Sequence, residues 1–249
     1  MAVEYTNDYL LDKKVQILQP VNGYRASTDA VLLAAIIKDS IHHVRILDVG
    51  AGTGAVSLCL AQRLKHNSVE IYGVEIQPEL AELANMSAIA NGFDFLHYHH
   101  ADIRQKLAND NMQPCSFDIV VTNPPYSAHD LPSPNRSKAT AHNLEAFDLD
   151  SWLAFCLKMT KPFGHLYLIN RAEALPQICA ALRGKAGGLV VLPIYSKEGQ
   201  KAKRVIVAAQ KDSKAPAEIL PPFVVHDESG NYTSEAQKIL REGIGFNNL

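Results

Sequence analysis

The sequence has no hydrophobic run long enough to cross a membrane. Its longest such run is Ala30–Ile37, which has eight residues, whereas a membrane-spanning helix needs about 20. The first residues contain neither a basic stretch nor a long apolar one, so we expect no signal peptide. These two absences favour a protein of the cytoplasm.

Cysteine is also scarce in this chain of 249 residues, which has only four. They are Cys59, Cys115, Cys156 and Cys179. They lie far apart and form no CxxC pair, so neither a disulfide framework nor a zinc site is expected, and we predict buried, reduced thiols. Histidines are grouped at 97, 99 and 100, but no further ligand stands at a usable spacing. We therefore predict packing or surface histidines and no metal.

The chain carries little net charge. Lysine and arginine total 24 and aspartate and glutamate total 26, which gives a formal charge of −2. This balance excludes binding to nucleic acid through bulk charge. The charge is uneven, however, because residues 171–214 sum to +6 and leave −8 for the rest. Lys201, Lys203 and Arg204 in this segment are candidate phosphate contacts; the alternative is a solvated hairpin whose lysines keep it soluble.

From residue 44 onward, short β-rich runs alternate with amphipathic stretches. This alternation is typical of βαβ units around a parallel sheet. The predicted strands are Val44–Val49, Val69–Glu75, Phe95–His100, Phe117–Thr122, His165–Asn170, Leu189–Tyr195 and Arg204–Ala209. The predicted helices are Gly54–Leu64, Pro78–Asn91, Leu149–Met159 and Ala172–Leu182, and Trp152 is expected in the core.

The predicted fold class is α/β, with seven strands in a mostly parallel sheet. The last two strands are joined by a turn that contains lysine and glycine, so we expect an antiparallel hairpin at the edge of the sheet. We place the main domain at residues 44–214. A lead segment over residues 1–43 is expected to pack on it through a helix at Ala30–Ile37. Residues 215–249 are expected to form a tail with a short helix, capped by Ser234 and Gln237.

A glycine-rich turn follows the first strand of the predicted domain. Asp48 is followed by Gly50, Gly52 and Gly54, and a helix begins directly afterwards. Glycines allow positive φ and a close approach to a ligand, and a helix N-terminus offers free N–H groups. Ala55 stands where a dinucleotide fingerprint has its third glycine. An acid at Asp48 repels a pyrophosphate and attracts an ammonium group, so we predict S-adenosylmethionine rather than NAD as the cofactor.

Two further acids stand at the ends of the next two strands. Glu75 can accept hydrogen bonds from both ribose hydroxyls of a nucleoside, and Asp102 from an adenine amine. Open α/β sheets bind ligands at the carboxyl ends of their strands. We therefore predict that both acids belong to the cofactor site; the alternative is that they are ordinary turn and surface acids.

The fourth predicted strand runs into Asn123, Pro124, Pro125 and Tyr126. The prolines restrict the backbone, so the Asn123 side-chain oxygen and the Pro124 carbonyl can accept the two hydrogens of an NH₂ group. Such contacts draw a planar nitrogen toward tetrahedral geometry and stabilise the charge that develops during methyl transfer. Tyr126 offers a ring on which the target group stacks, and Pro125 borders it. The alternative is an ordinary turn after a strand.

These two motifs together resemble those of the class I S-adenosylmethionine-dependent amino-methyltransferases. The segment Gln19–Ala34 further resembles the lead segment of the bacterial tRNA1(Val) adenine-N6 methyltransferases, and the resemblance covers residues 15–210. It implies a Rossmann-like methyltransferase domain that acts on N6 of the adenine beside a tRNA anticodon.

The same resemblance assigns four further sites. Thr28 and Asp29 would lie near the methionine end of the cofactor, which Asn123 would also contact. Arg136 and Ala141–His142 match the polar loop that borders the substrate pocket. The expected partner is RNA, and the expected assembly is a monomer or weak dimer.

Other functions stay open. Glutamine N5-methylation in a release factor uses the same tetrapeptide, but residues 1–43 are too few for the docking domain that such enzymes usually carry. Methylation of guanine N2 in rRNA or of adenine in DNA remains an alternative. A non-catalytic subunit that binds S-adenosylmethionine is disfavoured, because such a subunit need not keep the motif at Asn123.

Overall fold

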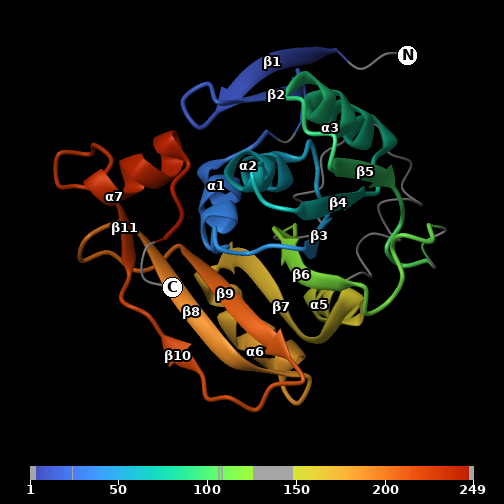
Figure 1. Ribbon diagram of the computed structural model, residues 1–249. Helices are drawn as coiled ribbons and strands as arrows, with labels where there is room; N and C mark the ends of the chain where they lie inside the picture. Colours follow the sequence, from blue (N-terminus) through green and yellow to red (C-terminus); the bar gives the residue numbers. More distant parts are fainter. Residues whose placement is uncertain (1–3, 24, 106, 108, 126–147, 247–249) are drawn as a thin grey trace.

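The computed structural model (Figure 1) describes residues 4–23, 25–105, 107, 109–125 and 148–246. Its strands are β1 (Tyr5–Leu10), β2 (Val15–Pro20), β3 (Val44–Val49), β4 (Val69–Glu75), β5 (Leu96–His100), β6 (Phe117–Thr122), β7 (Thr160–Arg171), β8 (Ala186–Lys197), β9 (Arg204–Lys211), β10 (Glu218–Ile219) and β11 (Phe223–His226). Its α-helices are α1 (Thr28–Ala35), α2 (Ala55–Leu64), α3 (Pro78–Ala90), α5 (Leu149–Met159), α6 (Leu175–Leu182) and α7 (Ser234–Gln237), with short helical turns η2 (Ala172–Ala174) and η3 (Lys238–Glu242).

The central sheet has nine strands in the described part of the chain. Their order is β10-β8-β9-β7-β6-β3-β4-β5, and β11 also pairs with β8. From β3 to β7 all pairs are parallel, and β9 is antiparallel to both of its neighbours. The chain moves outward from β3 to β5 and then returns to β6 on the other side of β3. Such a switch point is where open α/β sheets bind ligands.

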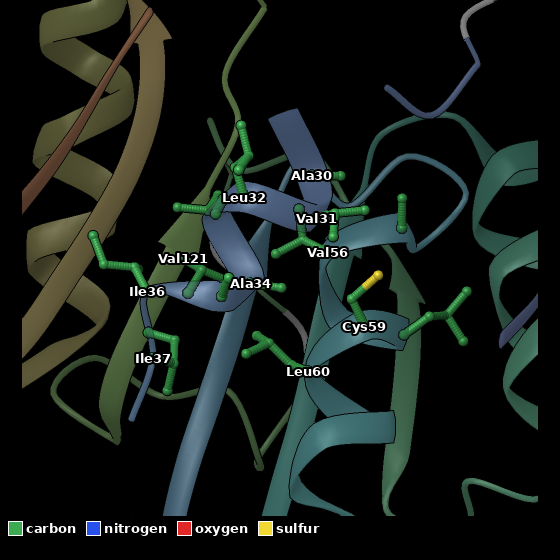
Figure 2. Packing of buried hydrophobic residues seen from close by; sticks show 14 of the residues in the cluster. Ala30, Val31, Leu32, Ala34, Ile36, Ile37, Val56, Cys59, Leu60 and Val121 are labelled. Atoms are coloured by element: carbon green, nitrogen blue, oxygen red, sulfur yellow. The ribbon is translucent and has the colours of Figure 1, made fainter. Parts of the chain in front are cut away.

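Two layers of helices cover the sheet. Alternate residues of β3 serve the two sides, because Ile46 belongs to one buried cluster and Leu47 to the other. The first cluster also contains α1 and α2, and the second contains α5 and α6. Figure 2 shows Leu60 of α2 and Val121 of β6 beside the side chains of α1.

After its first two residues, helix α1 is apolar and buried on all sides. Its residues from Ala30 to Ala35 are all buried. It packs on α2, β7 and the C-terminal turn η3, and Phe246 donates its N–H to the Ala35 carbonyl. A helix without a polar face is stable only in such surroundings. Both ends of the chain are thereby attached to the same side of the core.

The predicted α/β class and the edge hairpin are confirmed, and all seven predicted strands are present. The sheet nevertheless has nine strands, because β10 and β11 were missed in the proline-rich tail. The two-stranded sheet of β1 and β2 was also missed. Helix α1 begins at Thr28, earlier than predicted, because Ser27 caps it and accepts from the Asp29 N–H. The division into three stretches stays a prediction.

Two predictions of detail were wrong. The short C-terminal helix is capped by Thr233, which accepts from the Ala236 N–H, and not by Ser234. Of the cysteines, Cys59 and Cys156 are buried as predicted. The other two are exposed, because each stands on the solvent side of its turn or helix. They are Cys115 and Cys179.

Candidate functional site

The predicted cofactor turn follows β3 and the predicted catalytic motif follows β6, and these neighbouring strands end at the same level of the sheet. Val49 of β3 pairs with Thr122 of β6 in parallel register. Gly50 and Asn123 are the next residues along the two strands, which lie about 4.8 Å apart. The two motifs therefore meet at the switch point of the sheet, although 73 residues of sequence separate Val49 from Thr122.

The glycine turn takes a conformation that other residues rarely adopt. Gly50, Gly52 and Gly54 have φ of 73°, 57° and 86°. A Cβ atom on Gly50 would lie 2.7 Å from the Trp152 ring, and one on Gly54 would lie 2.2 Å from the Tyr98 hydroxyl. No atom lies within 4 Å of a Cβ placed on Gly52. The turn is thus packed against protein below and open at Gly52, as a cradle for a cofactor must be.

Asp48 lies beneath the turn and not on its open side. Its carboxyl group is 1% exposed and accepts a hydrogen bond of 2.8 Å from the Ser57 hydroxyl. The Ser57 hydroxyl lies 2.9 Å from that of Tyr98, which donates to the Gly54 carbonyl at 3.2 Å. Burial raises the pKa of Asp48 to about 7. Asp48 is thus buried beneath the turn, and its attraction for the ammonium group of the cofactor stays a prediction.

We expect Asp48→Asn to stabilise the protein at pH 8 by about 1 to 3 kcal/mol, because asparagine buries no charge. The pKa of Asp48 is about 7 in the folded protein against an ordinary value of 3.8. Between these two pH values the folded state therefore keeps a proton on Asp48 that the unfolded chain has lost. The stability that protonated Asp48 allows is fully present below pH 3.8 and is lost as the pH rises to about 7. Denaturant unfolding at pH 5 and pH 8 measures the difference.

The same substitution should weaken S-adenosylmethionine binding, since a cationic cofactor favours an ionised Asp48. In the unmodified protein the affinity should rise from pH 6 to pH 8, and in Asp48→Asn it should stay flat, as calorimetry can show. Asp94→Asn, which changes an exposed carboxylate, is the control. An equal pH dependence in all three proteins would contradict this role of Asp48.

Glu75 ties the turn to the end of β4. Its two carboxylate oxygens accept the N–H of Gly52 at 3.0 Å and the N–H of Gln77 at 2.8 Å. Burial raises the pKa of Glu75. The Gln77 side-chain amide also donates to this carboxylate, at 3.4 Å. A carboxylate has about four acceptor positions, so one is still open, and a ribose hydroxyl that displaces the long Gln77 contact would open a second; binding of the ribose stays a prediction.

Asp102 lies beside Glu75 because the preceding residue is anchored there. The N–H of Ala101 donates to the Glu75 carbonyl at 2.9 Å. The Asp102 carboxylate accepts from Arg104 Nε at 2.8 Å and Nη2 at 2.6 Å. These hydrogen bonds lower the pKa of Asp102. An adenine amine at this position, which stays a prediction, would share the carboxylate with Arg104.

Trp152 has a role at the site that the sequence did not reveal. It packs on the second buried cluster, as expected for a core residue. Its Nε1 also donates to the Thr122 hydroxyl at 2.9 Å, and that hydroxyl donates to the Val49 carbonyl at 2.8 Å. Trp152 therefore links the floor of the glycine turn to the residue before Asn123. No spacing in the sequence indicated this contact, since helical phase alone places Trp152 in the core.

The motif residues after β6 differ in exposure. Asn123 is half-buried, Pro124 is buried and Pro125 is exposed. Tyr126 lies outside the described residues, as do Arg136 and Ala141–His142. The described part of the motif therefore presents Asn123 at the carboxyl edge, beside the glycine turn.

Asp29 and Arg204 form an ion pair. Arg204 Nε lies 2.9 Å from Asp29 Oδ2, and both side chains are mostly buried. Arg204 pairs in the sheet with Arg171, the last residue of β7, so the ion pair lies at the carboxyl edge. Asp29, which was predicted to contact the cofactor, is thus paired with Arg204, which was predicted to contact phosphate. Thr28, at the start of α1, is exposed.

Lys201 and Lys203 are exposed in the turn between β8 and β9. They lie at the carboxyl edge because β8 ends there and β9 begins there. They are therefore available for phosphate contacts, whereas Arg204 is held by Asp29.

The grouped histidines are packing and surface residues: His97 and His100 are exposed, and His99 is half-buried. The rings of His97 and His99 lie against Tyr72, with centroid separations of 5.6 and 6.2 Å. The described residues contain no group of three or more side chains suited to hold a metal ion. Nor does any helix among them have the length and apolar character needed to cross a membrane.

Comparison with known proteins identifies the class. A family model described as a methyltransferase domain matches residues 41–215. The solved structure of a predicted O-methyltransferase from Agrobacterium tumefaciens is 26% identical, with a TM-score of 0.72 over 89% of this chain and 100% of that one. The fold and the glycine turn at the switch point are those of class I S-adenosylmethionine-dependent methyltransferases, which confirms the predicted enzyme class and cofactor.

Sequence relatives narrow the family. A tRNA1(Val) (adenine(37)-N6)-methyltransferase from Actinobacillus succinogenes is 30% identical over 224 residues, which are 88% of this chain and 89% of the relative. An enzyme of the same name from Porphyromonas gingivalis is 32% identical over 170 residues, 67% of this chain and 66% of the relative. The chain belongs to the methyltransferase family of these enzymes, and the resemblance inferred from the sequence is confirmed.

Proposed function

We propose that this protein transfers a methyl group from S-adenosylmethionine to N6 of the adenine beside the anticodon of a tRNA. The observation that carries the proposal is the register of β3 and β6, which puts Asn123 next to the glycine turn. Family membership supports the substrate, because the relatives named above are tRNA adenine(37)-N6 methyltransferases. We infer further that the protein works in the cytoplasm as a monomer or weak dimer.

The residues present fit the cofactor. Gly52 leaves an open cradle, Glu75 lies beside it with an acceptor position to spare, and Asp48 supplies negative charge from below. When bound, S-adenosylmethionine supplies an electrophilic methyl group on a sulfonium sulfur. Asp102 would accept from the adenine of the cofactor. Thr28 and Asp29, at the start of α1, would border its methionine end.

Asn123 and Pro124 would act on the substrate amine. Their oxygens accept its two hydrogens, which localises the nitrogen lone pair and stabilises the positive charge that forms as the methyl group arrives. Tyr126 would stack on the target base, which must leave its own stack to reach the site. Pro125 and Arg136 would border this pocket, and Lys201 and Lys203 would bind phosphates.

Incubation with labelled S-adenosylmethionine tests the proposed function. Separate pools of tRNA, rRNA, DNA and release factor would be offered to the pure protein, and mass spectrometry would locate the modified position. We expect label in tRNA, on N6 of adenine 37 as the names of the relatives indicate. Label confined to release factor would instead support glutamine N5-methylation. Label confined to rRNA or DNA would show that this nucleic acid, and not tRNA, is the substrate.

Replacement of Lys201 and Lys203 by glutamine should weaken tRNA binding. It should also reduce the slope of log K against log salt by about 1 for each phosphate that is no longer bound. Arg204 is left unchanged because it forms an ion pair with Asp29. Lys185→Gln with Lys214→Gln is the matched control, since these exposed lysines flank the other ends of β8 and β9. An unchanged salt slope after replacement of Lys201 and Lys203 would show that this turn does not contact the RNA.

A further inference from the structure

A hollow of about 360 Å³ lies in the C-terminal part of the chain, outside the methylation site. It is formed where β11, the turn that follows it and the helical segment α7–η3 come together. Its lining residues are His226, Gly230, Asn231, Tyr232, Gln237 and Arg241. Two aromatic rings, two side-chain amides and a guanidinium group thus surround one space.

The aromatic and cationic groups of the hollow lie close together. The rings of His226 and Tyr232 are stacked, with centroids 5.2 Å apart and an angle of 22° between their planes. The guanidinium carbon of Arg241 lies 5.8 Å from the centroid of the Tyr232 ring. Unpaired bases bind proteins through such aromatic rings and guanidinium planes.

The rings are held in place by the backbone beneath them. His226 and Tyr232 face each other across an antiparallel bridge, and the N–H of Asp227 donates to the Asn231 carbonyl at 2.9 Å. His226 Nδ1 lies 3.1 Å from the Ser196 carbonyl oxygen. The side-chain oxygen of Asp227 accepts from the Asn231 N–H at 2.9 Å, which closes the turn. A ligand would therefore meet a preformed surface.

The hollow opens at the same edge of the sheet as the methylation site. Strand β11 runs parallel to β8, and its last residue, His226, pairs with Lys197, the last residue of β8. Four strand spacings, through β7, β9 and β8, separate β11 from β6. At about 4.8 Å each, these place β11 about 19 Å across the sheet from β6.

Cationic side chains occupy the edge between the two sites. Arg171 ends β7, Lys201 and Lys203 lie in the exposed turn between β8 and β9, and Lys197 ends β8. The ammonium group of Lys197 donates to the Glu228 carbonyl in the turn beside the hollow. Phosphates that run along this edge could contact these lysines, although Arg171 is paired with Glu173.

We propose that this hollow is a second nucleotide subsite for the substrate RNA. An unpaired base packs against the rings of His226 and Tyr232, Asn231 and Gln237 bind its edge, and Arg241 binds a flanking phosphate. The inference rests on the proposed tRNA substrate and adds an interaction remote from the reacting adenine. The guanidinium group of Arg241 alone would suit a phosphorylated peptide as well as RNA. The two aromatic rings beside it favour a nucleotide base.

Two variants test the subsite: Arg241→Gln, which changes an exposed side chain, and Tyr232→Leu, which keeps an apolar residue but removes the ring. Each should raise both the Kd for full-length tRNA and the KM of methylation at least about five-fold, because Tyr232→Leu removes a ring on which the base stacks and Arg241→Gln removes the charge that binds the flanking phosphate. The matched controls, Arg183→Gln and Phe163→Leu, change exposed side chains toward the other edge of the sheet and should leave the Kd unchanged.

The two proposals can fail separately, because Kd is measured without methyl transfer. Wild-type affinity in both variants, with tRNA still methylated, would overturn the subsite and leave the proposed function intact. Absence of tRNA methylation by the unmodified protein would overturn the function. Cross-linking of 4-thiouridine-substituted tRNA gives a second readout should Tyr232→Leu fail to fold: we expect cross-links within residues 226–241, and cross-links elsewhere only would overturn the subsite.

Discussion

Asn123→Ala is expected to lower the single-turnover rate of tRNA methylation by about 100- to 1,000-fold. The reason is that alanine cannot accept a hydrogen from the substrate amine, so the nitrogen lone pair stays delocalised and the developing charge loses a partner. S-adenosylmethionine should still bind, because the glycine turn, Glu75 and Asp48 are held by contacts that do not involve the Asn123 side chain. Rates under single turnover and cofactor binding by calorimetry measure the two effects separately.

Asn123→Asp is the matched variant for this prediction. It keeps an acceptor oxygen of the same reach, so its rate should lie between that of the unmodified enzyme and that of Asn123→Ala. A near-normal rate in Asn123→Ala would refute the proposed amine contact. A loss of cofactor affinity with little change in rate would instead assign Asn123 to cofactor binding alone.

Gly54→Ala should have the second large effect, a loss of about 3 kcal/mol in the free energy of unfolding. Gly54 has φ of 86°, which costs alanine about 1 to 2 kcal/mol. The added Cβ would also lie 2.2 Å from the Tyr98 hydroxyl. Tyr98 would have to move away from Ser57 and the Gly54 carbonyl, and the buried hydrogen bonds above Asp48 would break. Denaturant unfolding measures the change, and cofactor affinity should fall with it.

Gly92→Ala separates the two causes. Gly92 has φ of 69°, similar to that of Gly54, but no atom lies within 4 Å of a Cβ placed there. We therefore expect it to cost only the backbone penalty of about 1 to 2 kcal/mol and to leave cofactor binding unchanged. An equal loss of unfolding free energy in the two variants would show that the packing of Tyr98 under the turn contributes nothing to stability.

The strands that were missed show which local signals are weak. Strand β10 has two residues and β11 has four, too few for a pattern of alternation to appear. Strand β2 depends on distant partners: the Leu18 N–H donates to the Ser87 hydroxyl, and Asn91 of the turn after α3 accepts from the Gln16 N–H. A search for local patterns cannot see these two hydrogen bonds, because their partners lie about 70 residues away from β2.

Local patterns in the sequence were enough to establish the α/β class, the positions of the main strands along the chain and the two motifs at strand ends. These follow from local physics: β-branched runs, glycines before a helix, and prolines after a strand. It took the packed fold to place Asn123 beside Gly50, to close the floor of the turn with Trp152 and Tyr98, and to hold Arg204 against Asp29. The raised pKa of Asp48 likewise comes from packing. Strand register, burial and ion pairing arise between segments far apart in the chain, so they exist only once those segments have packed together.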